Sequence, residues 1–545
     1  MKKWNIINSK KDLSEEKLLD ILLENRGLKT KIQKQKFLSP KLSEVTIESV
    51  GIDKRQLKKA TERIKRAVSK KKQIIVFGDY DVDGICGTAI LWETLNDIGA
   101  KVLPYIPSRF EEGYGLSVKG IDNLLKTIPE IDLIITVDNG IVANDAVEYA
   151  VKLGIDVIIT DHHVPSKKNP NAYSIVHTTL LCGAGVAYLL SKQLKKEKED
   201  NHLELVVLAT IADLVPLTYA NRIFVYFGLE ALRKTKRIGL LSLFRSAVIE
   251  SGSIDVYEIG HIIAPRLNAM GRLSSAMDSL RLLCTKDRQR ADILAKALSD
   301  TNFERQRFTT EALIHAKDMA KTKIINNLLF IADESYREGI IGLVAGRLVE
   351  EFYLPSIVIS KGKVYSKASV RSVKGFNIIE FLREASDLLV DVGGHPMAAG
   401  FTVETKNLDL LEQKLYKLAA KLLKKKTLER VLNIDLELPS ELINFKTYEL
   451  VCKFKPFGMA NPEPTFVTRN LTVESLRIIG KDGKHLKLGL KPKYSSFWLD
   501  AIAFGMGELN SFKIKDVVDV VYTLEENEWN GNKRLQLKVK DIRKL

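Results

Sequence analysis

Aspartates stand where four apolar stretches of this sequence end. Each stretch has the composition of a buried strand, and each is followed directly by groups that can bind a metal ion or a proton. These groups are Asp79, Asp81 and Asp83 after QIIVF, Asp138 after LIITV, Asp161, His162 and His163 after VIIT, and Asp213 after VVLATIA. Because ligands of open parallel sheets bind beyond the carboxyl ends of the strands, we expect these side chains to converge on one edge of a sheet.

A cluster of this kind needs compensation for its negative charge. Two ionised carboxylates about 4 Å apart repel by roughly 4 kcal/mol at an effective dielectric constant near 20. Divalent cations can relieve the repulsion, and protonation is the alternative. Carboxylates with one or two imidazoles and no thiolate suit Mn²⁺ or Mg²⁺. Two such ions about 3.5–4 Å apart with a shared carboxylate are the usual arrangement for in-line displacement at phosphorus.

Taken one at a time, these aspartates have a plainer interpretation. An aspartate after a strand is most often a turn former or a helix N-cap. Asp161 is open to this interpretation, in which it only holds the neighbouring histidines. The recurrence of the pattern along the chain favours the metal site for the set as a whole.

The elements around these residues predict a parallel α/β domain. Strand-like runs that begin at 73, 101, 131 and 155 alternate with helical stretches and show little polar alternation, as expected when helices cover both faces. The strand pattern stops after VVLATIADLVPL, and residues 222–325 are expected to be mainly helical. A second α/β unit begins at NNLLFIAD, and the last hundred or so residues carry the short alternating strands typical of a small β-barrel or sandwich. We expect boundaries at 1–50 for an N-terminal extension, 51–225 for the first α/β domain, 226–325 for a helical connector, 326–435 for the second α/β domain and 436–545 for the β-rich domain.

Composition narrows the class of protein. The chain has 545 residues and a formal net charge of +16, which favours a polyanionic partner about as strongly as it favours a lysine-rich proteome. Its four cysteines form no CxxC pair, which argues against a zinc site or a disulfide framework and for a reducing compartment. We see no signal peptide and no apolar run long enough to span a bilayer, so we expect a cytoplasmic protein without membrane contact.

Short motifs in these positions resemble those of a known superfamily. DYDVDG (79–84), TVDNG (136–140), DHH (161–163) and IADLVPL (211–217) match, in order, the four motifs of the DHH phosphoesterases, and GGHPMAAGF (393–401) is similar to the signature of their associated second domain. SRFEEGYGL (108–116), APRLNAMGR (264–272) and KPFGMANPEPTF (455–466) resemble the RecJ branch. The resemblance implies a parallel-sheet DHH domain, a second α/β DHH-associated domain joined by helices, and a C-terminal OB-fold-like barrel. It also implies a single-strand-specific 5′→3′ DNA exonuclease that releases 5′-mononucleotides with two Mn²⁺ or Mg²⁺ ions, in DNA repair and recombination.

The resemblance assigns a role to each matching position. The implied metal ligands are Asp79, Asp81, Asp83, Asp138, His162 and Asp213, with Asp138 as the bridge and His163 as a donor to the phosphate oxygens. Many superfamily members have a metal-binding histidine two residues before the first of these aspartates, where this chain has Phe77. In our interpretation Asp79 takes the place of this histidine. The coordination of the first metal is therefore less well defined than that of the second.

The same resemblance implies where the nucleic acid lies. Arg109 and Tyr114 line the entrance, and Arg266, Asn268 and Arg272 grip backbone phosphates. The pocket for a terminal phosphate comprises Ser369, Arg371, Ser372, Gly394 and His395. Arginine suits this role because its planar fork binds phosphate bidentately, although each arginine taken alone could equally form a structural salt bridge. The implied partners are single-stranded DNA with a free 5′ end, single-strand-binding protein and a helicase.

Two other functions remain open at this point. Relatives of similar motif content act on short oligonucleotides or cyclic dinucleotides, but they need no basic β-rich domain. Other relatives are non-catalytic DNA-binding subunits of the replication machinery that have lost their metal ligands, whereas this chain retains the aspartates and both histidines.

Overall fold

The computed structural model describes residues 2–10, 13–109, 111–195, 201–325, 327–424, 428–493, 497–507, 512–529 and 531–545. The chain forms two compact units. Unit 1 comprises residues 1–51, 214–230 and 431–545, and unit 2 comprises residues 52–213 and 231–430. None of the helices in the described part of the chain combines the length and the apolarity that crossing a bilayer requires. The five expected boundaries stay predictions.

A parallel five-stranded sheet in unit 2 carries the aspartates. Its strands, in spatial order, are β3 (Lys101–Tyr105), β2 (Gln73–Phe77), β4 (Leu133–Val137), β5 (Asp156–Asp161) and β6 (Ser174–His177). The register places Phe77 beside Thr136 and Val137 beside Thr160, so β2, β4 and β5 end at the same edge. The chain order reverses on either side of β2, and such a reversal is where open α/β sheets bind ligands.

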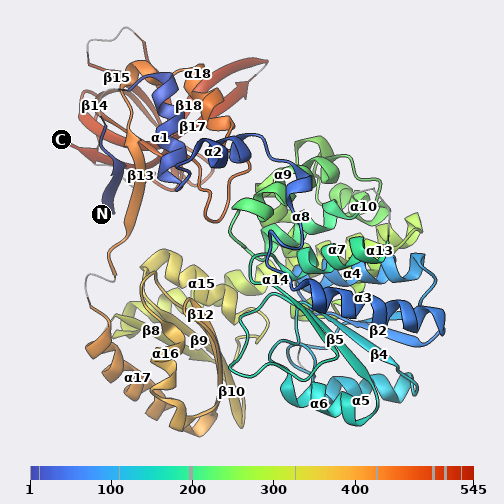
Figure 1. The fold of residues 1–545 in the computed structure, drawn as a ribbon. Helices are drawn as coiled ribbons and strands as arrows, with labels where there is room; N and C mark the ends of the chain where they lie inside the picture. The colour runs from blue at the N-terminus through green and yellow to red at the C-terminus, as the bar shows by residue number, and fades with distance from the viewer. Residues whose placement is uncertain are drawn as a thin grey trace. The chain divides into compact units, whose positions relative to one another are not determined.

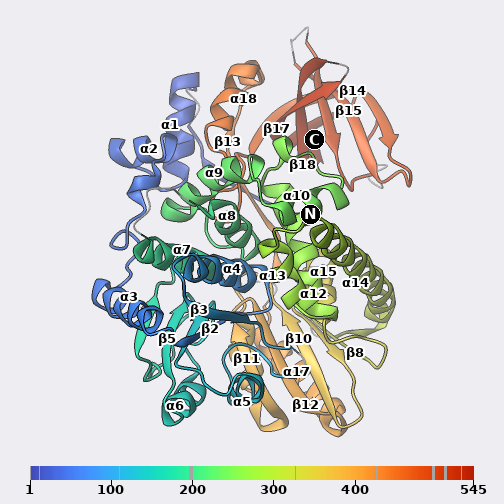
Figure 2. The same cartoon turned by 90° about the vertical axis from the view of Figure 1, so that its right-hand side faces the viewer.

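Helices cover both faces of this sheet. They are α3 (Lys54–Ser69), α4 (Val82–Asp97), α5 (Val118–Thr127), α6 (Asn144–Lys152) and α7 (Gly183–Leu194), and α8 (Leu203–Ala212) packs on α4 and α7. Figure 2 shows α5 and α6 on one face and α3, α4 and α7 on the other. The run VVLATIA, which we included in the strand pattern, is the helix α8. It is buried along almost its whole length, so its apolar residues show no helical periodicity.

The connector is helical, as expected. It comprises the end of α9 (Tyr219–Arg233), α10 (Ile238–Ser246), α11 (Val256–Glu258), a π-helical turn at Ile259–Ile263, α12 (Ala264–Leu273), α13 (Met277–Cys284) and α14 (Arg288–Lys323). Figure 1 shows α14 leading toward the second α/β region of unit 2.

The second sheet of unit 2 is mixed. Its six strands, in spatial order, are β11 (Leu389–His395), β12 (Ala398–Glu404), β10 (Tyr365–Arg371), β9 (Ser356–Ser360), β8 (Leu328–Asp333) and β7 (Ile324–Ile325). The helices α16 (Ile378–Arg383) and α17 (Leu408–Leu422) pack on one face. The helices α14 and α15 (Ile341–Phe352) pack on the other.

Unit 1 is built on a seven-stranded sheet. The strands are β1 (Lys3–Asn8), β13 (Val431–Glu437), β14 (Phe466–Ile479), β15 (His485–Pro492), β16 (Leu499–Ala503), β18 (Asn532–Lys544) and β17 (Val517–Trp529), and β14 also pairs with β17. That additional pairing closes the last five strands into a ring, which confirms the expected small barrel. The edge strand β1 pairs in parallel with β13 and was not predicted.

The N-terminal helices complete the core of unit 1. They are α1 (Glu15–Asn25) and α2 (Lys31–Leu38), and unit 1 also holds most of α9 and the helix α18 (Phe445–Cys452). Leu18, Leu22 and Leu23 of α1 are fully buried against side chains of the barrel such as Phe466 and Tyr522. Residues 1–51 are therefore an integral part of the compact unit that also holds the barrel.

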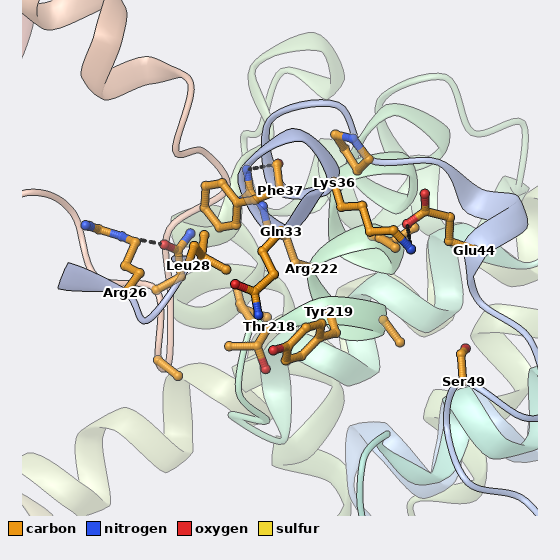
Figure 3. Close-up of a pocket in the computed structure, with 16 residues that line it drawn as sticks. Arg26, Leu28, Gln33, Lys36, Phe37, Glu44, Ser49, Thr218, Tyr219 and Arg222 are labelled. Carbon is orange, nitrogen blue, oxygen red and sulfur yellow. Dashed lines mark hydrogen bonds and ion pairs between the residues drawn. The ribbon is translucent and has the colours of Figure 1, made fainter. Parts of the chain in front are cut away.

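A cavity of about 270 Å³ lies between these helices and residues 217–223 of the same unit (Figure 3). Arg222 borders it, with its guanidinium 3.8 Å from the ring centroid of Phe37. This guanidinium donates to the carbonyl oxygens of Lys453 and Phe454, 3.4 and 2.9 Å away, just beyond the end of α18. Because the carboxyl end of a helix carries partial negative charge, these bonds compensate the buried cation. Arg222 thus has a structural role beside the cavity.

Candidate metal centre and nucleic-acid interface

The three alternating aspartates have three different local tasks. Asp79 lies buried in the loop after β2. Asp81 is the N-cap of α4, and its Oδ1 accepts from the backbone N–H groups of Asp83 and Gly84. Asp83 lies in the first turn of α4, and its carboxylate accepts from the N–H groups of Gly183 and Ala184 at 2.6 and 2.7 Å. Besides offering carboxylate oxygens, Asp81 and Asp83 thus tie the starts of α4 and α7 to the same edge.

Two glycines permit the close approach of these segments. A Cβ at Gly84 would lie 2.6 Å from the backbone nitrogen of Asp79, and one at Gly183 would lie 2.6 Å from Cβ of Asp138. Asp138 itself has a φ of 64°, in the left-handed region that aspartate tolerates better than most residues. Its N–H donates to Thr160 O at 3.0 Å, which holds the end of β4 against β5.

The predicted ligands meet in three overlapping groups of possible metal donors. Asp79, Asp81 and Asp138 form one, Asp83, His162 and Asp213 form the second, and Asp138, His162 and His163 form the third, with the donor atoms of each group within 4.8 Å of one another. His162 Nε2 lies 3.1 Å from Asp138 Oδ1, 3.6 Å from Asp83 Oδ2 and 3.7 Å from Asp213 Oδ2. Asp213 follows the helix α8 and not a strand, so its arrival at this edge is due to helix packing.

Burial and mutual repulsion raise the pKa values of these carboxyl groups. Burial is the larger cause for Asp79 and Asp138, whose pKa values lie well above the ordinary carboxyl value, followed by repulsion from Asp81 and Asp83 respectively. The pKa of Asp213 is raised to about 8 by burial and then by Asp83 and Asp81. Burial lowers the pKa of His162, which favours the neutral ligand form of its imidazole.

Unpartnered buried atoms show that this donor set fits divalent cations. Asp79 Oδ1, Asp138 Oδ1 and His162 Nε2 are buried and have no hydrogen-bond partner among the described residues. Such atoms are costly to bury unless a ligand satisfies them. The set consists of carboxylate oxygens and imidazole nitrogen, which matches Mn²⁺ or Mg²⁺. Phe77, at the position of the missing histidine, is fully buried and packs on Tyr105, so it lies in the core beneath the cluster.

Asp161 positions the histidines, as one interpretation of the sequence held. Its Oδ1 accepts from the N–H groups of His162 and His163 and lies 2.8 Å from His163 Nδ1. Burial alone would lower the pKa of His163, but this carboxylate raises it to about 8. Tyr114, predicted at the entrance, donates its hydroxyl to Asp138 O at 3.0 Å and lies 3.2 Å from His163 Nε2.

Three arginines that we call the arginine cluster, Arg109, Arg272 and Arg371, lie beside the metal groups. Burial lowers the pKa of Arg272 to about 10, and the neighbouring charges of Arg109, Arg305 and Arg371 add to the effect. Arg272 interacts electrostatically with Asp81, and Arg109 does so with Asp79. Ser369 accepts from Arg371 at 3.1 Å. Three guanidinium groups gathered in this way suit an anionic ligand such as a phosphate, and that role stays a prediction.

The remaining predicted residues are not all brought to the cluster. Asn268 Oδ1 accepts from Val82 N at 3.0 Å, which fixes the start of α4. Arg266 donates to Ile262 O and Ser299 Oγ, and Ser372 donates to Phe376 O. Gly394, with a φ of 139°, and His395 lie exposed on β11, where His395 pairs with Ala398. Their roles in binding stay predictions.

Known proteins share this sequence and this fold. The DHH family N-terminal domain matches residues 73–215, the DHHA1 domain residues 321–422, and the RecJ OB domain residues 434–541. The single-stranded-DNA-specific exonuclease RecJ of Bacillus subtilis is 36% identical over 541 residues, which is 96% of this chain and 67% of that protein. The protein of the same name from Escherichia coli is 31% identical over 89% of this chain and 90% of its own length.

A solved structure agrees with the whole fold. The crystal structure of Thermus thermophilus RecJ in complex with Mn²⁺ aligns with a TM-score of 0.85 and 28% identity, covering 100% of this chain and 80% of that one. A second crystal structure of that protein contains Mg²⁺ and aligns with a TM-score of 0.79. The expected architecture, with its DHH, DHH-associated and OB domains, is thereby confirmed. The chain belongs to the RecJ family of single-stranded-DNA-specific exonucleases.

Proposed function

We propose that this chain degrades single-stranded DNA from a free 5′ end and releases 5′-mononucleotides, with two divalent cations as cofactors. The observation that carries the proposal is the position of the arginine cluster directly beside the buried metal donors. An anion site next to a two-metal site suits a substrate that ends in a phosphate and is cut one phosphate further along.

The proposed ligands divide into two sets around Asp138. Asp79, Asp81 and Asp138 would hold one cation, and Asp83, Asp138, His162 and Asp213 the other. When bound, the two ions would supply Lewis-acid activation of a water molecule and stabilisation of charge on the phosphate oxygens. The chain itself contributes fixed geometry, because both helix starts and both strand ends are tied together at this edge.

His163 and Tyr114 face the same space and have protons to donate. With a pKa raised to about 8, His163 is largely protonated at neutral pH and can donate to a non-bridging phosphate oxygen. Tyr114 retains its proton because burial and the charge of Asp138 raise its pKa. His163 would thus add a hydrogen-bond donor where negative charge grows during the displacement, and Tyr114 would do so by exchanging its bond to Asp138 O for one to the substrate.

The arginine cluster gives the reaction its direction in this proposal. A terminal 5′-phosphate bound by Arg272, Arg371 and Ser369 would place the next phosphate over the metal donors. The OB domain of unit 1 suits the single strand that follows, since such folds bind single strands through stacking and backbone contacts. Single-strand-binding protein and a helicase are proposed as partners in repair and recombination, and the cytoplasm as the location.

The test is digestion of 5′-labelled and 3′-labelled single strands of a few tens of nucleotides with Mn²⁺, beside a blunt duplex. We expect labelled mononucleotide at once from the 5′-labelled strand only. Asp138→Asn should abolish release, because asparagine tolerates the left-handed backbone but removes the bridging charge. Asp333→Asn is the matched control, since Asp333 also ends a strand of unit 2 and its carboxylate accepts from the N–H and hydroxyl of nearby Ser335. An intact long strand beside a cleaved dinucleotide would favour the small-substrate alternative.

A further inference from the structure

An exposed pair of stacked rings is formed by Tyr257 of α11 and His261 of the π-helical turn before α12. The rings of Tyr257 and His261 are 4.4 Å apart between centroids and 17° from parallel. Tyr257 is 61% exposed, and His261 is exposed as well. His261 Nδ1 lies 3.1 Å from the carbonyl oxygen of Tyr257, which fixes the orientation of the imidazole. Two flat faces are therefore held parallel at the surface of unit 2.

The π-helical turn packs against α8, the helix that ends just before Asp213. A Cβ at Gly260 would lie 3.8 Å from Cγ2 of Ile211, and Asp213 follows two residues later. The π-helical turn therefore packs on the last turn of α8, next to the residue that precedes Asp213. π-Helical turns are rare and occur most often at functional sites.

Helix α12 connects the two ends of the site. Its far end carries Arg272, which interacts with Asp81, and Gly271, where a Cβ would lie 2.5 Å from Tyr80 O. Its near end follows directly on the π-helical turn and carries Arg266. The arginine cluster thus lies beside Asp79 and Asp81, and the stacked rings lie on the side of Asp213.

We propose that Tyr257 and His261 form a stacking platform for a base of the DNA strand on the 3′ side of the scissile phosphate. The inference rests on the proposed function, in which the terminal phosphate occupies the arginine cluster. The strand that remains must then leave on the opposite side, past Asp213. Every base offers a flat face, so such a platform holds the strand without reading its sequence.

Two acidic side chains, Asp255 and Glu258, stand next to the rings in the sequence. Asp255 and Glu258 are engaged in a capping box at the start of α11, where the Asp255 N–H donates to Glu258 Oε2 at 2.8 Å. On the C-terminal side of His261, the nearest cationic residue in the sequence is Arg266. Its guanidinium is held by Ile262 O at 2.8 Å, so a positive charge stands at the base of the turn.

A scan with abasic nucleotides tests the platform in the wild-type protein. We would measure binding, in EDTA, of 5′-phosphorylated single strands that each lack one base at a successive position. Removal of one particular interior base should weaken binding about 5- to 100-fold, and its neighbours should matter less. The Tyr257→Ala/His261→Ala double variant should bind the intact strand with the same loss and become insensitive to that abasic position.

Further variants separate stacking from structure. Tyr257→Phe should bind as the wild type does, whereas Tyr257→Leu, which keeps apolar bulk without a ring, should lose affinity. Tyr365→Ala is the control, since Tyr365 is a 53% exposed tyrosine of unit 2 at the start of β10. An abasic penalty that is equal in the wild type and the double variant would overturn the platform. If the wild type digests single strands while the variants match it, only the platform fails; if the wild type digests none, the proposed function fails first.

Discussion

At the scale of single residues, the carboxylate cluster makes the metal-free protein sensitive to pH. The pKa of Asp213 is about 8 in the folded chain, against an ordinary value of 3.8. The folded chain therefore holds this proton more tightly than the unfolded chain does, and deprotonation destabilises the fold. The loss should begin as pH rises above about 4 and be complete above about 8. We expect the melting temperature in EDTA to fall more steeply between pH 5 and 9 in the wild type than in Asp213→Asn. Saturating Mn²⁺ should remove that difference, and equal slopes without metal would contradict the assignment.

Asp161 permits a second prediction at this scale. Its carboxylate holds the pKa of His163 at about 8, so Asp161→Asn should lower that pKa and move the alkaline limb of the kcat profile to lower pH. Loss of a residue that orients site groups typically costs about 10- to 100-fold in activity. The profile would be measured on single-stranded DNA with Mn²⁺. Asp122→Asn is the control, because Asp122 bonds Tyr149 Oη at 2.6 Å away from the site. An unmoved limb would show that Asp161 does not act through His163.

The sequence predicted which residues come together in the site, but it did not predict what each of them does there. Parallel register brings strand ends together, so aspartates after QIIVF and LIITV had to meet. Nothing in the sequence distinguishes Asp81, which caps α4, from Asp79, which has an unpartnered oxygen. Arg266 and Arg272 share one motif and one helix, yet only Arg272 interacts with Asp81. Side-chain direction decides these cases, and it depends on packing that spacing alone does not record.

At the scale of elements, the starts of α4 and α7 decide whether the site forms. Gly183→Ala would place a Cβ 2.6 Å from Cβ of Asp138, so we expect a loss of about 1–3 kcal/mol in the free energy of unfolding and a large loss of activity. Gly346→Ala in α15 is the matched substitution, since a Cβ there meets nothing within 4 Å. It should stabilise the protein by about 1 kcal/mol through helix propensity and leave activity unchanged. Chemical unfolding and the digestion assay check both, and a fully active Gly183→Ala would contradict the packing argument.

Two elements escaped prediction for different physical reasons. An apolar run such as VVLATIA suits a buried strand and a buried helix equally, and α8 is buried on all sides. The strand β1 has a parallel partner, β13, more than 400 residues away in the chain. Long-range pairing of that kind leaves no local signal in a polar, helical-looking segment.

At the scale of the whole molecule, the two units should respond to different perturbations. Every proposed metal ligand lies in unit 2, whereas Leu22 is fully buried in the core of unit 1. We expect calorimetry to resolve two unfolding transitions. Mn²⁺ should raise the midpoint temperature of the transition that belongs to unit 2. Leu22→Ala leaves a cavity in the core of unit 1, so it should lower the free energy of unfolding of that unit by about 2–5 kcal/mol and shift the other transition to lower temperature. A single transition that responds to both changes would show that the units unfold together.

The discontinuity of unit 1 has a consequence for the newly made chain. Residues 1–51 leave the ribosome first, but the barrel that buries Leu18, Leu22 and Leu23 begins about 380 residues later. At typical elongation rates of about 5–20 residues per second, that interval is roughly 20–80 s. Unit 2 is synthesised during this interval, because its last residue is 430. The leucines of α1 meanwhile stay without their partner surface, so this apolar helix face is exposed until the barrel strands have been made.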